Sequence, residues 1–306
     1  MTQIYDSKTA EVGGTTVRRA LPQRTRRTVG GWCFVDHFGP TSATAGPGGS
    51  GVQIGAHPHI GLHTVTWLVE GAAVHTDSLG TEQPLRPGQL NVMTAGRGIA
   101  HAEDTPIDRR GVMHGAQLWV AQPEATRDGP NGFEHHADLP RLTHGTIDLT
   151  VMVGELDGHR SPARADTPLF GAEVRVRGGA APRPSAVPLR PDFEYGVVVL
   201  DGEVHVDGEV VTPGHLAYLG IGRDEVALGG SATALLLGGE PFPEKLLMWW
   251  NFVGRTWDDI ASARDAWAAG DTERFAPVRT RLGTVPAPEL PAFAVTPSHA
   301  PDSSHE

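Results

Sequence analysis

The sequence predicts an all-β protein that contains two copies of one β-fold and a short helix near its C-terminus. Glycine and proline are frequent, with 39 Gly and 25 Pro among 306 residues, and they favour many short strands joined by turns over long helices. An internal repeat indicates the second copy, because Pro87-Gly88 followed by Leu90–Met93 is similar to Pro213-Gly214 followed by Leu216–Leu219. A turn followed by an apolar stretch therefore occurs at related places in both halves of the chain.

The strands are indicated by β-branched or alternating segments bounded by turn residues. Asp201-Gly202 and Asp207-Gly208 are typical hairpin turns in the second half. The expected strands lie at residues 30–35, 64–69 and 115–120 in the first half, and at 146–153, 172–176, 194–200, 203–206 and 233–237 in the second.

These patterns divide the chain into three parts. Residues 1–136 form the first predicted domain and residues 137–280 the second. Apolar residues at helical spacing predict a helix over 256–267, which Thr256 can cap and Gly270 can end. Residues 281–306 are rich in Pro and Ala with little to bury, so we expect a disordered tail there.

The composition argues against several classes of protein. The formal net charge of −11 is unfavourable for direct binding of nucleic acid, which needs a basic face. No apolar run approaches the ~20 residues of a membrane helix, and the first residues lack the apolar core of a secretory signal. Cys33 is the single cysteine, and its apolar neighbours would keep the thiol protonated and unreactive. We therefore expect a cytoplasmic protein that binds neither nucleic acid nor membranes.

The candidate chemistry is concentrated between Gly51 and Glu103. His57 and His59 are separated by one residue, as are His101 and Glu103. Side chains at i and i+2 of a strand point to the same face of the sheet, so each pair presents two ligand-type groups to one side. If the sheet closes into a barrel, the two pairs can converge in its interior. Three imidazoles and one carboxylate would suit one divalent transition metal such as iron, nickel, manganese or zinc.

The same stretch resembles the cupin superfamily, and within it the pirin family. Gly51 followed by His57-x-His59 is similar to the first cupin motif, and Pro87-Gly88 leading to His101 is similar to the second. The resemblance to pirins covers residues 15 to about 270 and rests on long ordered motifs: Asp36-His37-Phe38-Gly39-Pro40, His57-Pro58-His59, Met93-Thr94-Ala95-Gly96-Arg97-Gly98-Ile99, His101-Ala102-Glu103 and Gly239-Glu240-Pro241.

The resemblance implies two cupin-type (jelly-roll) β-barrel domains in tandem, with one metal in the first and none in the second. The metal is usually iron, so Fe(II) is the expected ion, with Ni, Mn, Cu and Zn as alternatives. The ligands carried over by the motifs are His57, His59, His101 and Glu103, the four residues that the strand argument selects. In the second barrel, the region around His205 has neither a His-x-His nor a His-x-Glu pair.

Two further histidines are candidates for a role beside the metal. Many pirins carry Glu or Gln where this chain has His63, and other cupins place a Glu ligand there. His63 could be a fifth ligand, a hydrogen-bond donor to a ligand, or a polar contact for the substrate, and we favour the last two. His114 follows the central stretch, and we expect it to pack beside the site or to support a ligand.

The implied activity is that of a metal-dependent dioxygenase, because members of the family resemble quercetin 2,3-dioxygenase, which opens a flavonol ring with O₂. Glu103 could take the proton of the substrate's hydroxyl if exclusion of water raises its pKa. Four apolar side chains are candidates for the wall of a pocket that holds an aromatic substrate: Phe38, Val65, Trp67 and Met93.

The alternative hypothesis is a non-enzymatic regulator, in which the oxidation state of the metal alters a surface that binds a transcription factor or a metabolic enzyme. An open apolar pocket at the metal distinguishes the two hypotheses, since an oxygenase needs one and a sensor does not.

Overall fold

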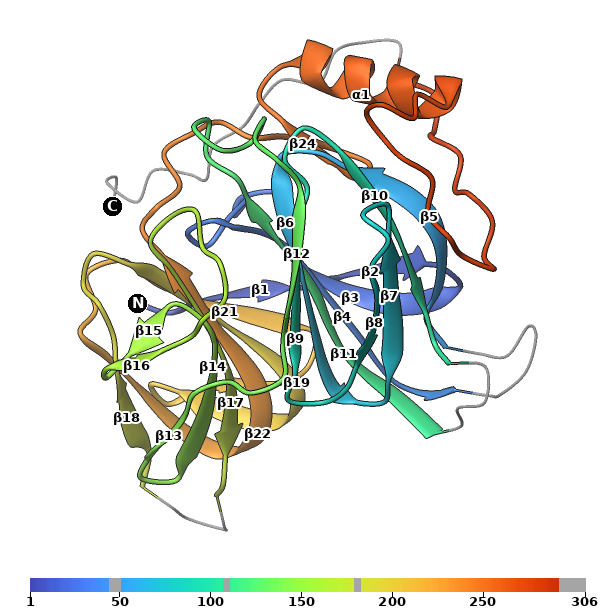
Figure 1. The fold of residues 1–306 in the computed structure, drawn as a ribbon. Helices are drawn as coiled ribbons and strands as arrows, with labels where there is room; N and C mark the ends of the chain where they lie inside the picture. The colour runs from blue at the N-terminus through green and yellow to red at the C-terminus, as the bar shows by residue number, and fades with distance from the viewer. Residues whose placement is uncertain (44–50, 107–110, 179–182, 292–306) are drawn as a thin grey trace.

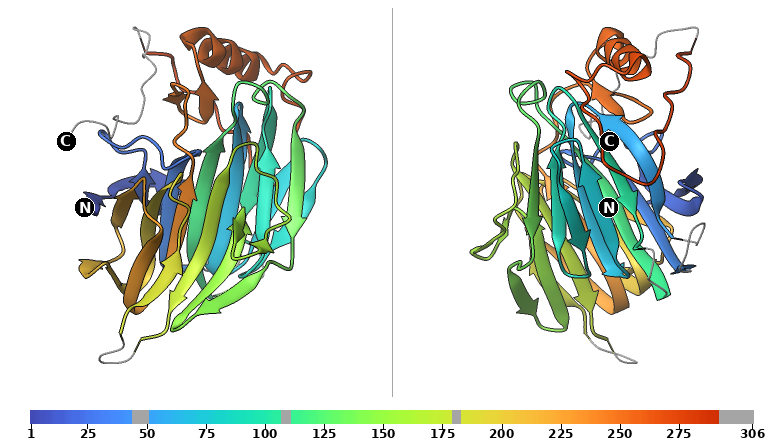
Figure 2. Two further views of the ribbon diagram at one scale, coloured as in Figure 1. Left: turned by 90° about the vertical axis from the view of Figure 1, so that its left-hand side faces the viewer. Right: turned by 45° about the vertical axis from the view of Figure 1, so that its right-hand side comes forward.

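The computed structural model describes residues 1–43, 51–106, 111–178 and 183–291. Within these ranges the chain forms 24 strands and one α-helix, which confirms the expected all-β class. Figure 1 shows two strand-rich units side by side, with the helix across one end of the first. The same helix stays at that end in both views of Figure 2.

The first unit consists of two sheets that face each other. One has four strands in the order β5 (Gln53–His59), β10 (Ile99–Asp104), β7 (Ala73–Asp77) and β8 (Glu82–Leu85). The other has seven strands in the order β12 (Gly132–His136), β9 (Leu90–Thr94), β6 (Leu62–Glu70), β11 (Gly111–Ala121), β4 (Trp32–Ala43), β3 (Thr15–Leu21) and β2 (Lys8–Val12). Both sheets are antiparallel, so residues far apart in sequence become direct neighbours.

The second unit is one nine-stranded antiparallel sheet. Its order is β1 (Gln3–Asp6), β21 (His215–Gly220), β19 (Glu194–Val206), β22 (Glu225–Gly239), β17 (Leu169–Val176), β14 (Ile147–Val153) and β13 (Arg141–His144), with β18 (Ser185–Pro188) on β22 and β20 (Glu209–Val211) on β19. Because β17 and β18 pair with different ends of the long strand β22, the sheet folds over its own interior. Two short ribbons complete the list: β15 (Glu155–Leu156) with β16 (His159–Arg160), and β23 (Leu247–Trp249) with β24 (Phe252–Gly254).

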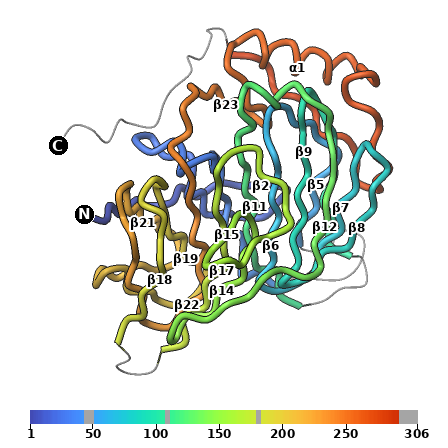
Figure 3. Tube along the Cα trace, turned by 60° about the vertical axis from the view of Figure 1, so that its left-hand side comes forward, coloured from blue at the N-terminus to red at the C-terminus, as the bar shows by residue number. Residues whose placement is uncertain are grey.

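The first strand of the chain belongs to the second unit. β1 pairs with β21, with Gln3 opposite Tyr218 and Asp6 opposite His215. Figure 3 accordingly places the N-terminus beside β21. The chain therefore begins on the second sheet before it builds the first unit, an arrangement that the hydrophobic pattern does not indicate.

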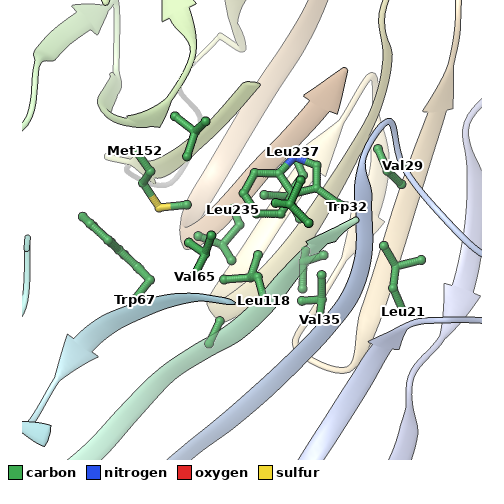
Figure 4. Close-up of a cluster of buried hydrophobic side chains, with 14 of the residues drawn as sticks. Leu21, Val29, Trp32, Val35, Val65, Trp67, Leu118, Met152, Leu235 and Leu237 are labelled. Atoms are coloured by element: carbon green, nitrogen blue, oxygen red, sulfur yellow. The ribbon is translucent and has the colours of Figure 1, made fainter. Parts of the chain in front are cut away.

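A large apolar core joins the two units, and Figure 4 shows part of it. Val65 and Trp67 of β6 meet Leu235 and Leu237 of β22 in this core. The indole of Trp67 donates to Glu173 Oε2 at 2.8 Å, so its one polar atom is satisfied where it is buried. The outer face of the first barrel's larger sheet is thus covered by the second unit.

The helix α1 (Trp257–Ala269) is close to the predicted one and has the predicted ends. Thr256 and Asp259 form a reciprocal capping box, and Gly270 adopts a left-handed conformation at φ 68°. Within the described residues, no helix is long and apolar enough to cross a membrane.

Residues 282–290, placed by the sequence analysis in the tail, lie against the first barrel and α1. Val285 N donates to Ala56 O at 2.8 Å, and Ala56 N donates to Gly283 O at 2.9 Å. The indole of Trp267 donates to Val285 O at 2.9 Å. This segment therefore runs alongside β5, the strand that carries the first two candidate ligands. The remainder of the predicted tail, residues 292–306, lies outside the described residues.

Candidate metal centre

Two neighbouring strands bring three of the predicted ligands together. His57 and His59 lie on β5, and His101 lies on β10 directly opposite His57 in the antiparallel pairing. One nitrogen from each ring lies within 4.8 Å of the other two, and all three residues are buried. The ring centroids are 4.3 Å apart for His57 and His101, and 5.0 Å apart for the other two pairs. The same-face argument from the sequence therefore places the three imidazoles correctly.

Each of the three imidazoles has a partner at Nδ1. His57 Nδ1 lies 2.8 Å from Gly55 O, and His59 Nδ1 lies 2.8 Å from Asn251 O. His101 Nδ1 lies 3.4 Å from His75 Nδ1. A carbonyl oxygen only accepts, so His57 and His59 carry their proton on Nδ1 and leave Nε2 as the lone-pair nitrogen. This is the arrangement that orients histidine ligands in metal proteins, so the group fits a metal.

Burial keeps these imidazoles neutral. Loss of hydration lowers the pKa of His57 to about 4. The same loss of hydration, with the neighbouring His57, lowers the pKa of His59 and of His101 well below the usual range. Neutral imidazole is the form that binds a metal, so no proton has to be displaced from these rings at neutral pH.

Glu103 lies near this group but is not one of its three members. It follows His101 on β10, and the register of the β5–β10 pairing shifts between the two residues. Its Oε1 accepts a hydrogen bond of 3.4 Å from Thr66 Oγ1, which also lies 2.9 Å from Gln117 Oε1. Burial raises the pKa of Glu103 to about 7 although Thr66 lowers it. Glu103 is therefore a carboxyl group that can gain or lose a proton near neutral pH.

A cavity of about 600 Å³ opens on the three histidines and Glu103. Its wall includes Phe34 and Trp119, whose rings stack with centroids 4.0 Å apart. The edge of the His59 ring meets Trp119 at a centroid distance of 5.2 Å. A volume of this size and an aromatic wall suit a drug-sized planar molecule.

Comparison with known proteins agrees with the sequence motifs. The Pirin family model matches residues 14–120, and the model for the Pirin C-terminal cupin domain matches residues 180–275. A pirin-like protein of Caulobacter vibrioides is 35% identical over 276 residues, which cover 87% of this chain and 93% of the relative. The chain belongs to the pirin family. The resemblance described above is confirmed, and with it the tandem cupin-type architecture.

Two further proteins are more similar to this chain. A Pseudomonas aeruginosa protein that carries the provisional name quercetin 2,3-dioxygenase is 46% identical over 293 residues, covering 95% of this chain and 89% of the relative. The crystal structure of quercetin 2,3-dioxygenase from Acinetobacter baumannii superposes with a TM-score of 0.89 at 42% identity, covering 96% of this chain and 97% of that one. This pirin therefore shares its fold along nearly its whole length with proteins named for dioxygenase activity.

The predicted pocket wall needs correction at three of its four residues. Phe38 lines the cavity, but Val65, Trp67 and Met93 are not among its lining residues. Alternation along β6 explains two of them: Thr66 and Leu68 face the cavity, whereas Val65 and Trp67 point into the core between the two units. Met93 packs in another apolar cluster of the first barrel.

His63 lies away from the metal centre, contrary to all three roles considered for it. Its Nδ1 lies 3.0 Å from Thr94 Oγ1, and its Nε2 lies 3.1 Å from Asp166 Oδ2. Burial raises the pKa of Asp166, but hydrogen bonds from His63, Arg164 and Thr126 hold it well below its usual value. The expectation failed because Gly61, at φ 68°, turns the chain between β5 and β6. Side-chain alternation does not continue through such a turn.

His114 also lies away from the metal centre. Its Nε2 lies 2.9 Å from His37 Nε2 and 3.2 Å from Leu200 O on β19. It therefore supports the contact between the two units, and it belongs neither to the group of three histidines nor to the residues that line the cavity.

The sequence analysis missed His75, which contacts the metal centre directly. It lies on β7, beside β10, and one residue separates it from Asp77 on the same strand. The spacing His75-x-Asp77 is the same i, i+2 signal that identified the other pairs, so the sequence contained a clue to it.

Proposed function

We propose that this protein is a metal-dependent dioxygenase that opens the ring of a flavonol-like substrate with O₂. The observation that carries the proposal is the group of three buried histidines at the wall of an aromatic-lined cavity of about 600 Å³. The names of the Pseudomonas and Acinetobacter relatives support quercetin as the first substrate to test.

In this proposal His57, His59 and His101 hold one divalent metal, and Glu103 is the fourth ligand. Iron(II) is the proposed ion, with nickel, manganese, copper and zinc as alternatives, because imidazole and carboxylate suit all of them. When bound, the metal supplies a positive centre that polarises the substrate's hydroxyl and a place for O₂.

The chain's own residues supply orientation and proton transfer. Phe34 and Trp119, which stack on each other, form the aromatic part of the cavity wall beside His59, against which the flavonol lies in this proposal. Glu103 takes the proton of the substrate's hydroxyl at its carboxylate, which lines the same cavity as the three histidines.

The test begins with anaerobic iron loading of the purified protein. Quercetin consumption and carbon monoxide release are then measured in air, with the metal content determined in parallel. We expect one metal per chain and iron-dependent release of carbon monoxide. The variant His101→Ala should lose both the metal and the turnover.

Two outcomes contradict the proposal in different ways. If metal binds at one per chain and no flavonol is consumed with any of the five metals, the dioxygenase proposal is wrong. A regulator that binds a protein partner then becomes the better hypothesis, although the cavity beside the histidines favours an enzyme. If the wild-type protein and His101→Ala hold the same small amount of metal, the proposal that these histidines bind a metal is wrong.

A further inference from the structure

A second pair of buried side chains lies directly behind His101. His75 Nδ1 lies 3.4 Å from His101 Nδ1, and His75 Nε2 lies 3.0 Å from Asp77 Oδ2. His75 and Asp77 are 5% and 1% exposed, so water does not compete for these contacts. The three residues form a chain from a carboxylate to the proposed metal ligand.

Both members of the pair are fixed in place. The other carboxylate oxygen of Asp77, Oδ1, accepts hydrogen bonds from Leu79 N at 2.9 Å and Thr81 N at 3.1 Å. The His75 ring stacks on Phe133 with centroids 4.5 Å apart and an interplanar angle of 23°. Oδ2 is therefore left for His75, whose ring plane is set by packing.

The contacts determine which nitrogen of each ring carries the proton. Asp77 can only accept, so the hydrogen of neutral His75 lies on Nε2 and its Nδ1 is an acceptor. His101 then donates from its own Nδ1, and its Nε2 keeps the lone pair. That Nε2 lies 3.0 Å from His59 Nε2, inside the group of three histidines.

His101 differs from the other two histidines in the kind of group that contacts its Nδ1. His57 and His59 have backbone carbonyls at Nδ1, which are acceptors under all conditions. His101 has a side chain that could be donor or acceptor, and only Asp77 makes it an acceptor. The tautomer of one proposed ligand thus depends on the Asp77 carboxylate, which acts through the ring of His75.

We propose that Asp77 and His75 are a positioning pair that holds His101 in the tautomer able to bind a metal. This inference rests on the metal centre in the proposed function but not on the dioxygenase reaction. It concerns the affinity for the metal and the geometry of its binding.

The sharpest variant is Asp77→Asn. The backbone N–H groups of Leu79 and Thr81 require an oxygen at the Oδ1 position, so the new amide nitrogen must face His75. An amide N–H donates, which moves the proton of His75 to Nδ1 and forces His101 to place its own proton on Nε2. We expect the affinity for Ni²⁺ or Co²⁺, measured by chelator competition, to fall roughly tenfold to hundredfold. The absorption spectrum of bound Co²⁺ should also change.

A matched control is available in the same molecule. Asp166 is also a carboxylate beside a histidine, with a side chain that is 7% exposed and His63 Nε2 at 3.1 Å, but it is not part of the group of three histidines. Asp166→Asn should leave Ni²⁺ affinity and the Co²⁺ spectrum unchanged even if it lowers the melting temperature. A loss of affinity in both variants would indicate general damage and overturn the assignment to Asp77.

A second variant tests the route through His75. His75→Phe removes the acceptor and keeps a ring that can stack on Phe133, so affinity should fall by a similar factor. Adding Asp77→Asn to His75→Phe should cause no further loss, because Asp77 then has no histidine through which to act. Wild-type affinity and an unchanged Co²⁺ spectrum in a folded Asp77→Asn protein would overturn the inference. If the affinity loss is observed while quercetin is not consumed, the positioning pair stands and only the dioxygenase proposal fails.

Discussion

The two barrels of this protein use related β-folds in opposite ways. The first contains the group of three histidines that could hold a metal and a cavity of about 600 Å³. The interior of the second is filled by a large cluster of buried apolar side chains, among them Val197, Val199 and Leu236. Its His205 lies on the surface, 43% exposed at the side chain and 3.1 Å from Glu203. The comparison shows that the fold alone does not provide a metal site, because the ligand side chains and an adjoining cavity must both be present.

The filled barrel still contributes to the site through its outer surface. The core between the two units buries one face of β6, the strand whose other face carries Thr66 and Leu68 into the cavity. Close packing on one face allows the other face to border an open space without collapse. The second barrel is thus a support for the first.

The largest expected effect is a loss of metal affinity when a histidine is removed from the first barrel but not from the second. His57→Ala removes one of three nitrogens from the buried group, so we expect metal affinity to fall by more than about a hundredfold. His205→Ala, the matched change in the second barrel, should leave affinity unchanged. Both are measured by chelator competition with Ni²⁺ and by metal content after dialysis. An equal loss in both variants would mean that the second barrel also holds metal.

The next effect tests the packing of the second barrel. Leu236 is fully buried in its interior, so Leu236→Ala leaves a cavity and should lower the free energy of unfolding by about 2–5 kcal/mol. Urea denaturation measures this loss. Metal affinity of the folded variant should stay at the wild-type value, because the change lies outside the first barrel. A parallel fall in affinity would show that the two interiors are coupled.

The third prediction concerns Glu103 in metal-free protein. Burial raises the pKa of Glu103 from 4.5 to about 7 in the folded state, so the folded chain holds this proton more tightly than the unfolded chain. The stability that Glu103 provides is fully present below about pH 4.5 and is lost as the pH rises through about 7. Glu103→Gln cannot lose a proton, so at pH 8 it should be more stable than wild type by up to about 3 kcal/mol.

Urea denaturation at pH 4.5 and pH 8, with metal removed by chelator, measures this difference. The advantage of Glu103→Gln should disappear at the lower pH. If the two proteins show the same dependence on pH, the carboxyl group of Glu103 is not desolvated as its burial indicates.

Local patterns were reliable where the chain stays on one strand or within one helix. The His-x-His pair on β5 and His101 on β10 were selected by the period of two, and the structure brings them together. The ends of α1 followed from Thr256 and Gly270, since capping depends on neighbouring residues alone. The same period applied to β7 would have identified His75 and Asp77.

The expectations failed where they crossed a turn or required knowledge of which face is covered. His63 was given a role beside the metal, but Gly61, at positive φ, turns the chain between β5 and β6, which belong to different sheets. Val65 and Trp67 were candidates for the cavity wall as apolar side chains, and alternation along a strand shows that they share a face but not which face it is. That choice is made by the second barrel, which covers them.

The sequence by itself therefore determined the all-β class, the three convergent histidines and the capped helix, because each depends on the fixed geometry of a strand or a helix turn. Only the tertiary structure decided which side of β6 borders the cavity, that β1 joins the second sheet, and that His75 stands behind His101. These features depend on contacts between residues distant in sequence, where packing and hydrogen bonding select one arrangement among several that the local pattern allows equally.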